Sequence, residues 1–156
     1  METRVNLLEK GMGAVKTLFG LNGYIKKCSI DDRLAHLIEF RVSQVNGCAY
    51  CLDMHWKDAV SKGESEQRLY GLSAWRESPY YSVRERAALA WSEAVTKARV
   101  PDDVYTEAES QFTDEELIDL TFIVTTINTW NRLNIAFPND VGSYAVGQFA
   151  MTTPTK

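Results

Sequence analysis

The chain has 156 residues and a formal net charge of -4. A chain of this length corresponds to one domain and can bury about 70% of the surface that its unfolded form exposes. Hydrophobic residues make up 45% of it and charged residues 24%, which is ordinary for a globular protein. The acidic balance, with a pI near 5.2, provides no basic surface for phosphate groups, so we expect no nucleic-acid partner and no binding to a membrane surface.

The beginning of the chain carries charges at Arg4, Glu9 and Lys10 and has no long apolar run. We therefore expect neither a signal peptide nor a spanning helix, and we expect a cytoplasmic protein. Three cysteines cannot all pair within one chain, and a reducing cytosol disfavours structural disulfides. Catalysis, metal binding and packing remain as roles for the cysteines.

Apolar residues recur at helical spacing through most of the chain, and no segment alternates for long enough to predict a strand. We predict an all-α fold, a single compact helical domain over 1–156 with about six to eight helices. Within it we distinguish an N-terminal helical segment over 1–29, a core over 30–137 that carries the motifs described below, and a loosely structured tail over 138–156.

The first helices are expected over about 4–18 and, interrupted by glycines, up to Lys27. Ser29 is predicted to cap the next helix. The apolar face of that helix consists of Leu34, Leu37, Ile38, Val42 and Val45. Asn46-Gly47 is typical of a helix end, so another helix is predicted from near Cys48 to about Lys62.

Two later helices are marked by capping boxes at their starts, Ser82-Val-Arg-Glu85 and Thr113-Asp-Glu-Glu116. Short helices are expected over about 64–71 and 102–111. The apolar stripe of the last helix turns polar at Asn131 and Asn134, and buried amides need partners. We expect this end to face a polar pocket or a subunit contact, with a plain surface exit as the alternative.

Cys48, Cys51 and His55 are the densest group of reactive side chains. On a helix that starts near Cys48, their i, i+3, i+7 spacing puts them on one face. The first turn of a helix stabilises a thiolate, and two cysteines separated by two residues can close a disulfide with little backbone movement. His55 lies one turn beyond Cys51 and can exchange a proton with its sulfur. We therefore assign Cys51 as nucleophile and Cys48 as resolving thiol in a dithiol–disulfide cycle.

The segment Arg41-Val-Ser-Gln-Val-Asn-Gly-Cys48-Ala-Tyr-Cys51-Leu-Asp-Met-His55 resembles the core of the AhpD-like alkylhydroperoxidases, within the carboxymuconolactone decarboxylase superfamily. The similarity continues through 63–69, 75–77, 84–91 and 127–133. The resemblance implies an all-helical fold and a homo-oligomer, a dimer, trimer or hexamer. It also implies a peroxidase that reduces alkyl hydroperoxides and is recharged by an external thiol or protein reductant.

In that family a glutamate twelve positions before the first cysteine, the CxxC pair and a following histidine form a proton relay from carboxylate to imidazole to sulfur. His36 stands in the place of the glutamate here, and Glu39 lies three residues on, on the same helix face. The resemblance therefore implies that His36, Glu39 or both complete the relay to His55. We expect no bound cofactor, because the chain has no dinucleotide-binding glycine pattern, so electrons should come from a partner or a small thiol.

Other interpretations of the same residues remain open. The site could exchange disulfides with a partner protein, or the chain could be a non-redox oligomeric module. His36, Cys48, Cys51 and His55 could form a four-ligand zinc site, although their spacing is unlike that of structural zinc sites, and our prediction is no metal. The superfamily name also suggests decarboxylation of a small lactone, but that reaction does not require a dithiol. Cys28, outside the motif, is predicted to be a packing residue.

Overall fold

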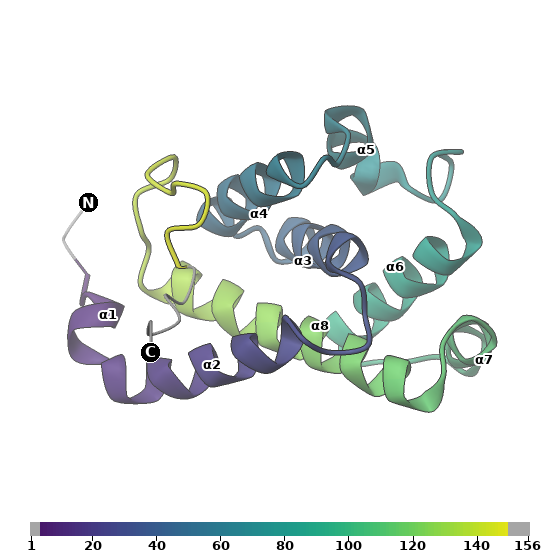
Figure 1. Ribbon diagram of the computed structural model, residues 1–156, viewed down its shortest axis with the longest axis horizontal. Coiled ribbons are helices and arrows are strands. Elements are labelled where there is room, and N and C mark those ends of the chain that lie inside the picture. Colours follow the sequence, from purple (N-terminus) through teal and green to yellow (C-terminus); the bar gives the residue numbers. More distant parts are fainter. Residues whose placement is uncertain (1–3, 150–156) are drawn as a thin grey trace, which may run out of the picture.

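The computed structural model describes residues 4–149, and every regular element in this range is helical (Figure 1). The elements are α1 (Leu7–Lys10), α2 (Met12–Ile25), α3 (Asp32–Asn46), α4 (Ala49–Ser61), α5 (Glu66–Gly71), the 3-10 helix η1 (Leu72–Ala74), α6 (Val83–Thr96), α7 (Asp102–Gln111) and α8 (Asp114–Ala136). The predicted all-α fold is confirmed. Of the predicted end segments, 1–3 and 150–156 lie outside the described residues.

Helix α3 is the central element, because α4, α6 and α8 all pack against it (Figure 1). Its apolar face is the predicted one, with Leu37, Ile38 and Val42 almost completely buried. Burying one such side chain contributes roughly 1.5–3 kcal/mol, so this face holds the surrounding helices together. His36, Glu39 and Ser43 lie on the opposite face of α3.

Both predicted capping boxes are present, at the starts of α6 and α8. The predicted cap of α3 is wrong. Asp31, not Ser29, accepts a hydrogen bond from the Leu34 backbone, at 3.0 Å. Ser29 instead donates its backbone N–H and its hydroxyl to Asp119 of α8, at 2.9 and 2.7 Å. Asp119 is buried, and a buried carboxylate is costly unless it accepts hydrogen bonds. Ser29 therefore bonds to Asp119 and does not cap α3.

The segment over 138–149 contains no helix, as predicted, yet it is attached to α4. Lys57 donates to the carbonyl oxygens of Gly142 and Tyr144, at 3.2 and 3.0 Å. The Tyr144 hydroxyl donates to Asp58 at 2.8 Å, and its ring is buried. This part of the predicted loose tail is therefore a packed cover beside α4 (Figure 1).

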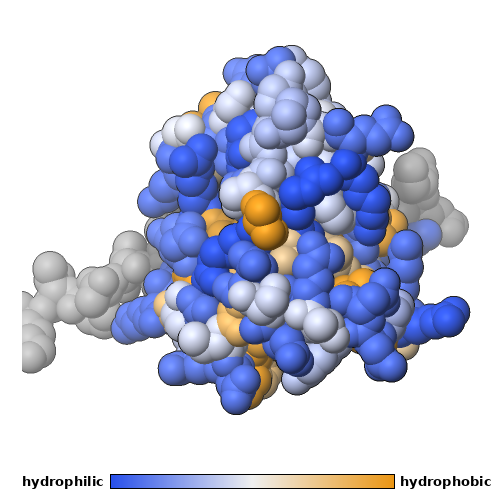
Figure 2. Space-filling model, turned by 90° about the vertical axis from the view of Figure 1, so that its right-hand side faces the viewer, coloured by the Kyte–Doolittle hydropathy of each residue, from blue (hydrophilic) through white to orange (hydrophobic). Residues whose placement is uncertain are grey.

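The surface at the end of the molecule formed by α6 and α7 is mostly hydrophilic, and the apolar residues visible there are scattered (Figure 2). None of the helices over the described residues is both long and apolar enough to cross a membrane.

A buried carboxylate joins α3, α6 and the turn after η1. Glu93 is 6% exposed and accepts hydrogen bonds from the Trp75 indole at 2.8 Å and from Arg41 at 2.9 Å. Arg76 forms an ion pair with it at 2.9 Å. Burial acts to raise the pKa of Glu93, but these donors outweigh it and lower that pKa below its usual value.

Glu93→Gln should lower the free energy of unfolding by about 3 kcal/mol, because it leaves the largely buried guanidinium of Arg41 without its counter-charge. The folded pKa of Glu93 is below the unfolded value of about 4.3, so the carboxylate stabilises the fold above that pH. This contribution disappears as pH falls through the folded value. Urea unfolding at pH 7 and at a series of lower pH values measures both effects. Glu109→Gln, at an exposed position of α7, is the control and should change little.

Candidate functional site

A left-handed glycine turns the chain from α3 into α4. Gly47 has φ 70°, and the N–H of Cys48 donates to the Ser43 carbonyl at 3.1 Å. The predicted helix end at Asn46-Gly47 is therefore confirmed. Cys48 is the N-cap of α4, and its sulfur accepts the backbone N–H of Cys51 at 3.3 Å. That amide lies where it would stabilise a Cys48 thiolate after reduction.

Cys48 and Cys51 form a disulfide, with their Cα atoms 5.3 Å apart. Both residues are buried, at 2% and 0% exposure. Cys28 stays free and packs against the apolar core, in agreement with its predicted role, and burial raises the pKa of its thiol. The sulfur pair thus has the geometry that a dithiol–disulfide cycle requires, while Cys28 takes no part in it.

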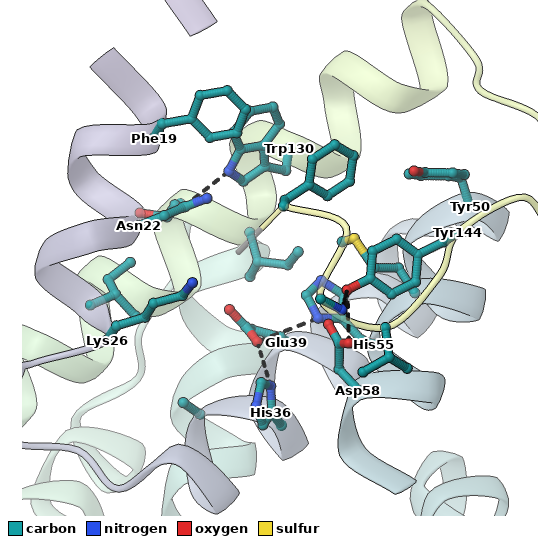
Figure 3. A pocket seen from close by; sticks show the side chains of 18 of the residues that line it. Phe19, Asn22, Lys26, His36, Glu39, Tyr50, His55, Asp58, Trp130 and Tyr144 are labelled. Carbon is teal, nitrogen blue, oxygen red and sulfur yellow. Dashed lines mark hydrogen bonds and ion pairs between the residues drawn. The ribbon is translucent and has the colours of Figure 1, made fainter. Parts of the chain in front are cut away.

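The carboxylate of Glu39 lies between two imidazoles (Figure 3). Its Oε2 is 3.2 Å from Nδ1 of His36, on the same helix, and 3.4 Å from Nδ1 of His55, on α4. The Glu39 side chain is 21% exposed, and this exposure opens onto a cavity. The sequence left open whether His36 or Glu39 accompanies His55, and the structure brings all three together.

The charges in this cluster are coupled. Desolvation acts to raise the pKa of Glu39, but the neighbouring imidazoles of His55 and His36 outweigh it and hold that pKa far below its usual range. Desolvation acts to lower the pKa of His36, and Glu39 overcomes it, so that the pKa of His36 is raised. Glu39 is therefore an anion that favours a protonated imidazole beside it.

His55 is enclosed more tightly than its partners, at 6% exposure. Its contact with Glu39 has the distance of an ion pair but not the angles of a hydrogen bond. Both ring nitrogens of His55 are buried and lack a hydrogen-bond partner among the described residues. The ring thus keeps unused capacity to bind a proton or another ligand.

A cavity of about 620 Å³ lies over this cluster (Figure 3). His36, Glu39 and His55 line one part of it. Its large apolar and aromatic lining residues come from α2, α4, α8 and the cover over 138–149, and they include Phe19, Tyr50, Met54, Trp130, Tyr144 and Phe149. Neither cysteine is among the lining residues, so of the three reactive side chains Cys48, Cys51 and His55 the cavity reaches His55.

Asp58 and Tyr144 belong to the lining as well, and no sequence pattern pointed to either residue. Burial and the Asp58 carboxylate raise the pKa of Tyr144 to about 12, so its hydroxyl stays a donor to Asp58. This bond closes the cavity on the side of α4. Tyr144 was missed because it stands 86 residues from its partner, in a segment without periodicity.

Amide side chains connect α8 to the last turn of α3. Asn131 is fully buried, accepts from Asn46 at 2.8 Å and donates to the hydroxyl of Ser43 at 3.1 Å. The predicted pocket or subunit contact is therefore wrong for Asn131, whose partners lie inside the fold. Asn134 does line a cavity, as predicted, but the lining of that cavity is largely apolar and aromatic. This network holds α3 immediately before the CxxC segment.

Comparison with known proteins agrees with this geometry. Residues 13–94 match the model of the carboxymuconolactone decarboxylase family. The uncharacterised protein YdfG of Bacillus subtilis is 42% identical over 146 residues, which span 92% of this chain and 99% of YdfG. A crystal structure of an Agrobacterium tumefaciens protein of unknown function, described as a candidate antioxidant defence protein AhpD, is 41% identical with a TM-score of 0.85, over 89% of this chain and 97% of that one.

The debrominase Bmp8, solved in complex with 2,3,4-tribromopyrrole, has a TM-score of 0.79 but only 22% identity, over 87% of this chain and 74% of Bmp8. That likeness shows a shared fold. Taken with the family match, the findings define the class: this chain belongs to the carboxymuconolactone decarboxylase family, and within it to the AhpD-like proteins.

Gly47→Ala should destabilise the protein by roughly 1–2 kcal/mol, because an alanine at φ 70° is strained although its Cβ would meet open space. Gly20→Ala provides the opposite control. This glycine lies inside α2, where an added Cβ also meets nothing, so alanine should stabilise the helix by roughly 0.5–1 kcal/mol. Thermal unfolding of both variants checks the pair. Equal effects would contradict the conformational explanation.

Proposed function

We propose that the protein is a thiol-dependent peroxidase that reduces organic hydroperoxides through Cys48 and Cys51. The observation that carries this proposal is the disulfide at the start of α4, with His55 one turn beyond Cys51 and within 3.4 Å of the Glu39 carboxylate. Residues i and i+4 of a helix share a face, so the imidazole lies on the side of the Cys51 sulfur.

The first step is attack of the Cys51 thiolate on the outer oxygen of the hydroperoxide. The O–O bond breaks, the leaving alkoxide takes a proton from the imidazolium of His55, and an alcohol and a Cys51 sulfenic acid result. The Cys48 thiolate then attacks the Cys51 sulfur, and hydroxide leaves as water after protonation. Two thiols are oxidised to one disulfide, and the peroxide is reduced by two electrons.

An external thiol or a protein reductant returns those electrons. Thiolate attack on a disulfide is faster when the leaving sulfur is the better-stabilised anion. The N–H of Cys51 stabilises Cys48 as a leaving thiolate. We therefore place the reductant's attack at the Cys51 sulfur, the same atom that meets the peroxide.

The cavity supports an organic substrate. Its volume of about 620 Å³ is within the usual range for sites that bind small organic molecules, and its lining is rich in aromatic side chains. Hydrogen peroxide alone would leave most of this apolar space unused. The resemblance of the Agrobacterium tumefaciens structure is in accord with such a role. A homo-oligomeric state, which the family resemblance implies, and a cytoplasmic location both remain proposals.

Cys51→Ser should reduce the consumption of cumene hydroperoxide in the presence of dithiothreitol to the uncatalysed rate, because a hydroxyl is a far poorer nucleophile than a thiolate. Cys28→Ser is the matched control and should keep the activity of the parent protein. The assay contains no partner protein. Peroxide consumption there supports a peroxidase, whereas disulfide exchange without peroxide consumption supports the alternative of a protein disulfide oxidoreductase.

Glu39→Gln should lower kcat by about 100-fold, the lower end of what general acid–base catalysis supplies, with little change in KM. The amide keeps the size of the side chain but places no negative charge beside His55. His36→Gln is the graded control: its side chain contacts Glu39, so we expect a smaller loss. Steady-state kinetics with cumene hydroperoxide measures both, and a kcat of Glu39→Gln equal to that of the parent would contradict the relay.

A further inference from the structure

The side chains of His36, Glu39 and His55 lie close enough together to act as ligands of one metal ion. One nitrogen or oxygen atom from each of the three residues can be chosen so that all three lie within 4.8 Å of one another. Two imidazoles and one carboxylate are the ligand types that bind Zn²⁺, Fe²⁺ and related ions in proteins. We propose that these three residues bind one divalent transition-metal ion.

The observed spacing is close to what coordination requires. Zinc binds histidine nitrogen and carboxylate oxygen at about 2.0–2.2 Å, so tetrahedral ligand atoms are separated by about 3.3–3.5 Å. Oε2 of Glu39 is 3.2 Å from Nδ1 of His36 and 3.4 Å from Nδ1 of His55. Two of the three separations therefore need almost no adjustment, and the third lies within the same 4.8 Å limit.

His55 supplies an independent indication. Its ring is more than nine-tenths buried, it lines the cavity beside Glu39, and neither of its nitrogens has a hydrogen-bond partner among the described residues. Buried polar atoms in native proteins are rarely left without a partner. A metal ion beside Glu39 would occupy one of these nitrogens.

The surroundings favour a cation with an open coordination position. The cavity lining includes Asp32 and Asp58 in addition to Glu39, against Lys26 and Lys62. Because these three carboxylates outnumber the two lysines, the cavity has a negative bias. Three protein ligands with a fourth position facing a cavity is the arrangement of metal sites that also bind water or a small molecule.

This site differs from the four-ligand zinc set that the sequence allowed. In that set the sulfurs of Cys48 and Cys51 would be ligands, but here they are bonded to each other. The proposed site uses Glu39 in their place and exists while the disulfide is closed. A metal ion on His55 and Glu39 would displace the proton that the peroxidase relay needs, so bound metal should inhibit turnover.

The test is a titration of tag-free protein, stripped with EDTA and then freed of it, with Zn²⁺ by calorimetry. We use the Cys48→Ser/Cys51→Ser variant beside the oxidised parent, and both should bind one ion per chain. His36→Gln and Glu39→Gln should each weaken binding by more than about 100-fold, beyond the loss expected for an outer-sphere residue. Glu66→Gln, an exposed carboxylate on α5, should bind like the parent.

Titration of the parent with Co²⁺ provides a readout that needs no variant: nitrogen and oxygen ligands produce visible d–d bands without the near-ultraviolet thiolate band. No binding up to about 1 mM, binding that survives His36→Gln and Glu39→Gln, or binding that requires the thiols would each overturn the proposal. Peroxide turnover in excess EDTA is measured separately. Activity there with no metal binding would leave the peroxidase standing and refute only the metal site.

Discussion

An ionised carboxylate enclosed by protein is costly unless cationic or hydrogen-bonding groups surround it, and Glu39 meets this requirement with an imidazole on each side. One imidazole comes from its own helix and the other from α4, so the contact depends on the relative position of α3 and α4. Gly47 sets the turn between these helices, and Asn131 of α8 holds the last turn of α3. These contacts thus hold Glu39 of α3 beside His55 of α4.

Local signals in the sequence predicted much of this scaffold. A capping box, a glycine that stops a helix, and a CxxC pair followed by a histidine all act within one or two turns, so neighbouring residues determine them. The helices around Ser82, Thr113 and Gly47 begin or end where these signals place them. Cys48 as a cap that accepts an amide hydrogen follows from the same local logic.

What the sequence could not give depends on distant partners. Ser29 has a residue type that suits a helix cap, but a buried carboxylate on α8 uses both of its donors. Tyr144 stands in a segment with no periodicity, yet its hydroxyl pairs with Asp58 and its ring covers the cavity. The choice between His36 and Glu39 was open for the same reason, because residues three apart share a helix face and only the facing helix can distinguish them.

The proton of the peroxidase relay and the proposed metal ion would need the same lone pairs, those of His55 and Glu39. General acid catalysis by His55 needs a ring nitrogen for its proton, whereas a divalent ion at the same place would be held by the Glu39 carboxylate and by both imidazoles. A divalent ion carries more charge than a proton, but it must lose part of its hydration shell to bind. Its ligands must also be deprotonated, so the ion binds only when all three donor atoms are free of protons. Closing the disulfide removes the thiolates that would otherwise attract the ion, which leaves the histidines and Glu39 as its ligands. Oxidation of the sulfur pair would therefore leave nitrogen and oxygen donors, and no thiolate of the CxxC pair, to bind a metal at this site, and it would stop peroxide reduction until the pair is reduced again.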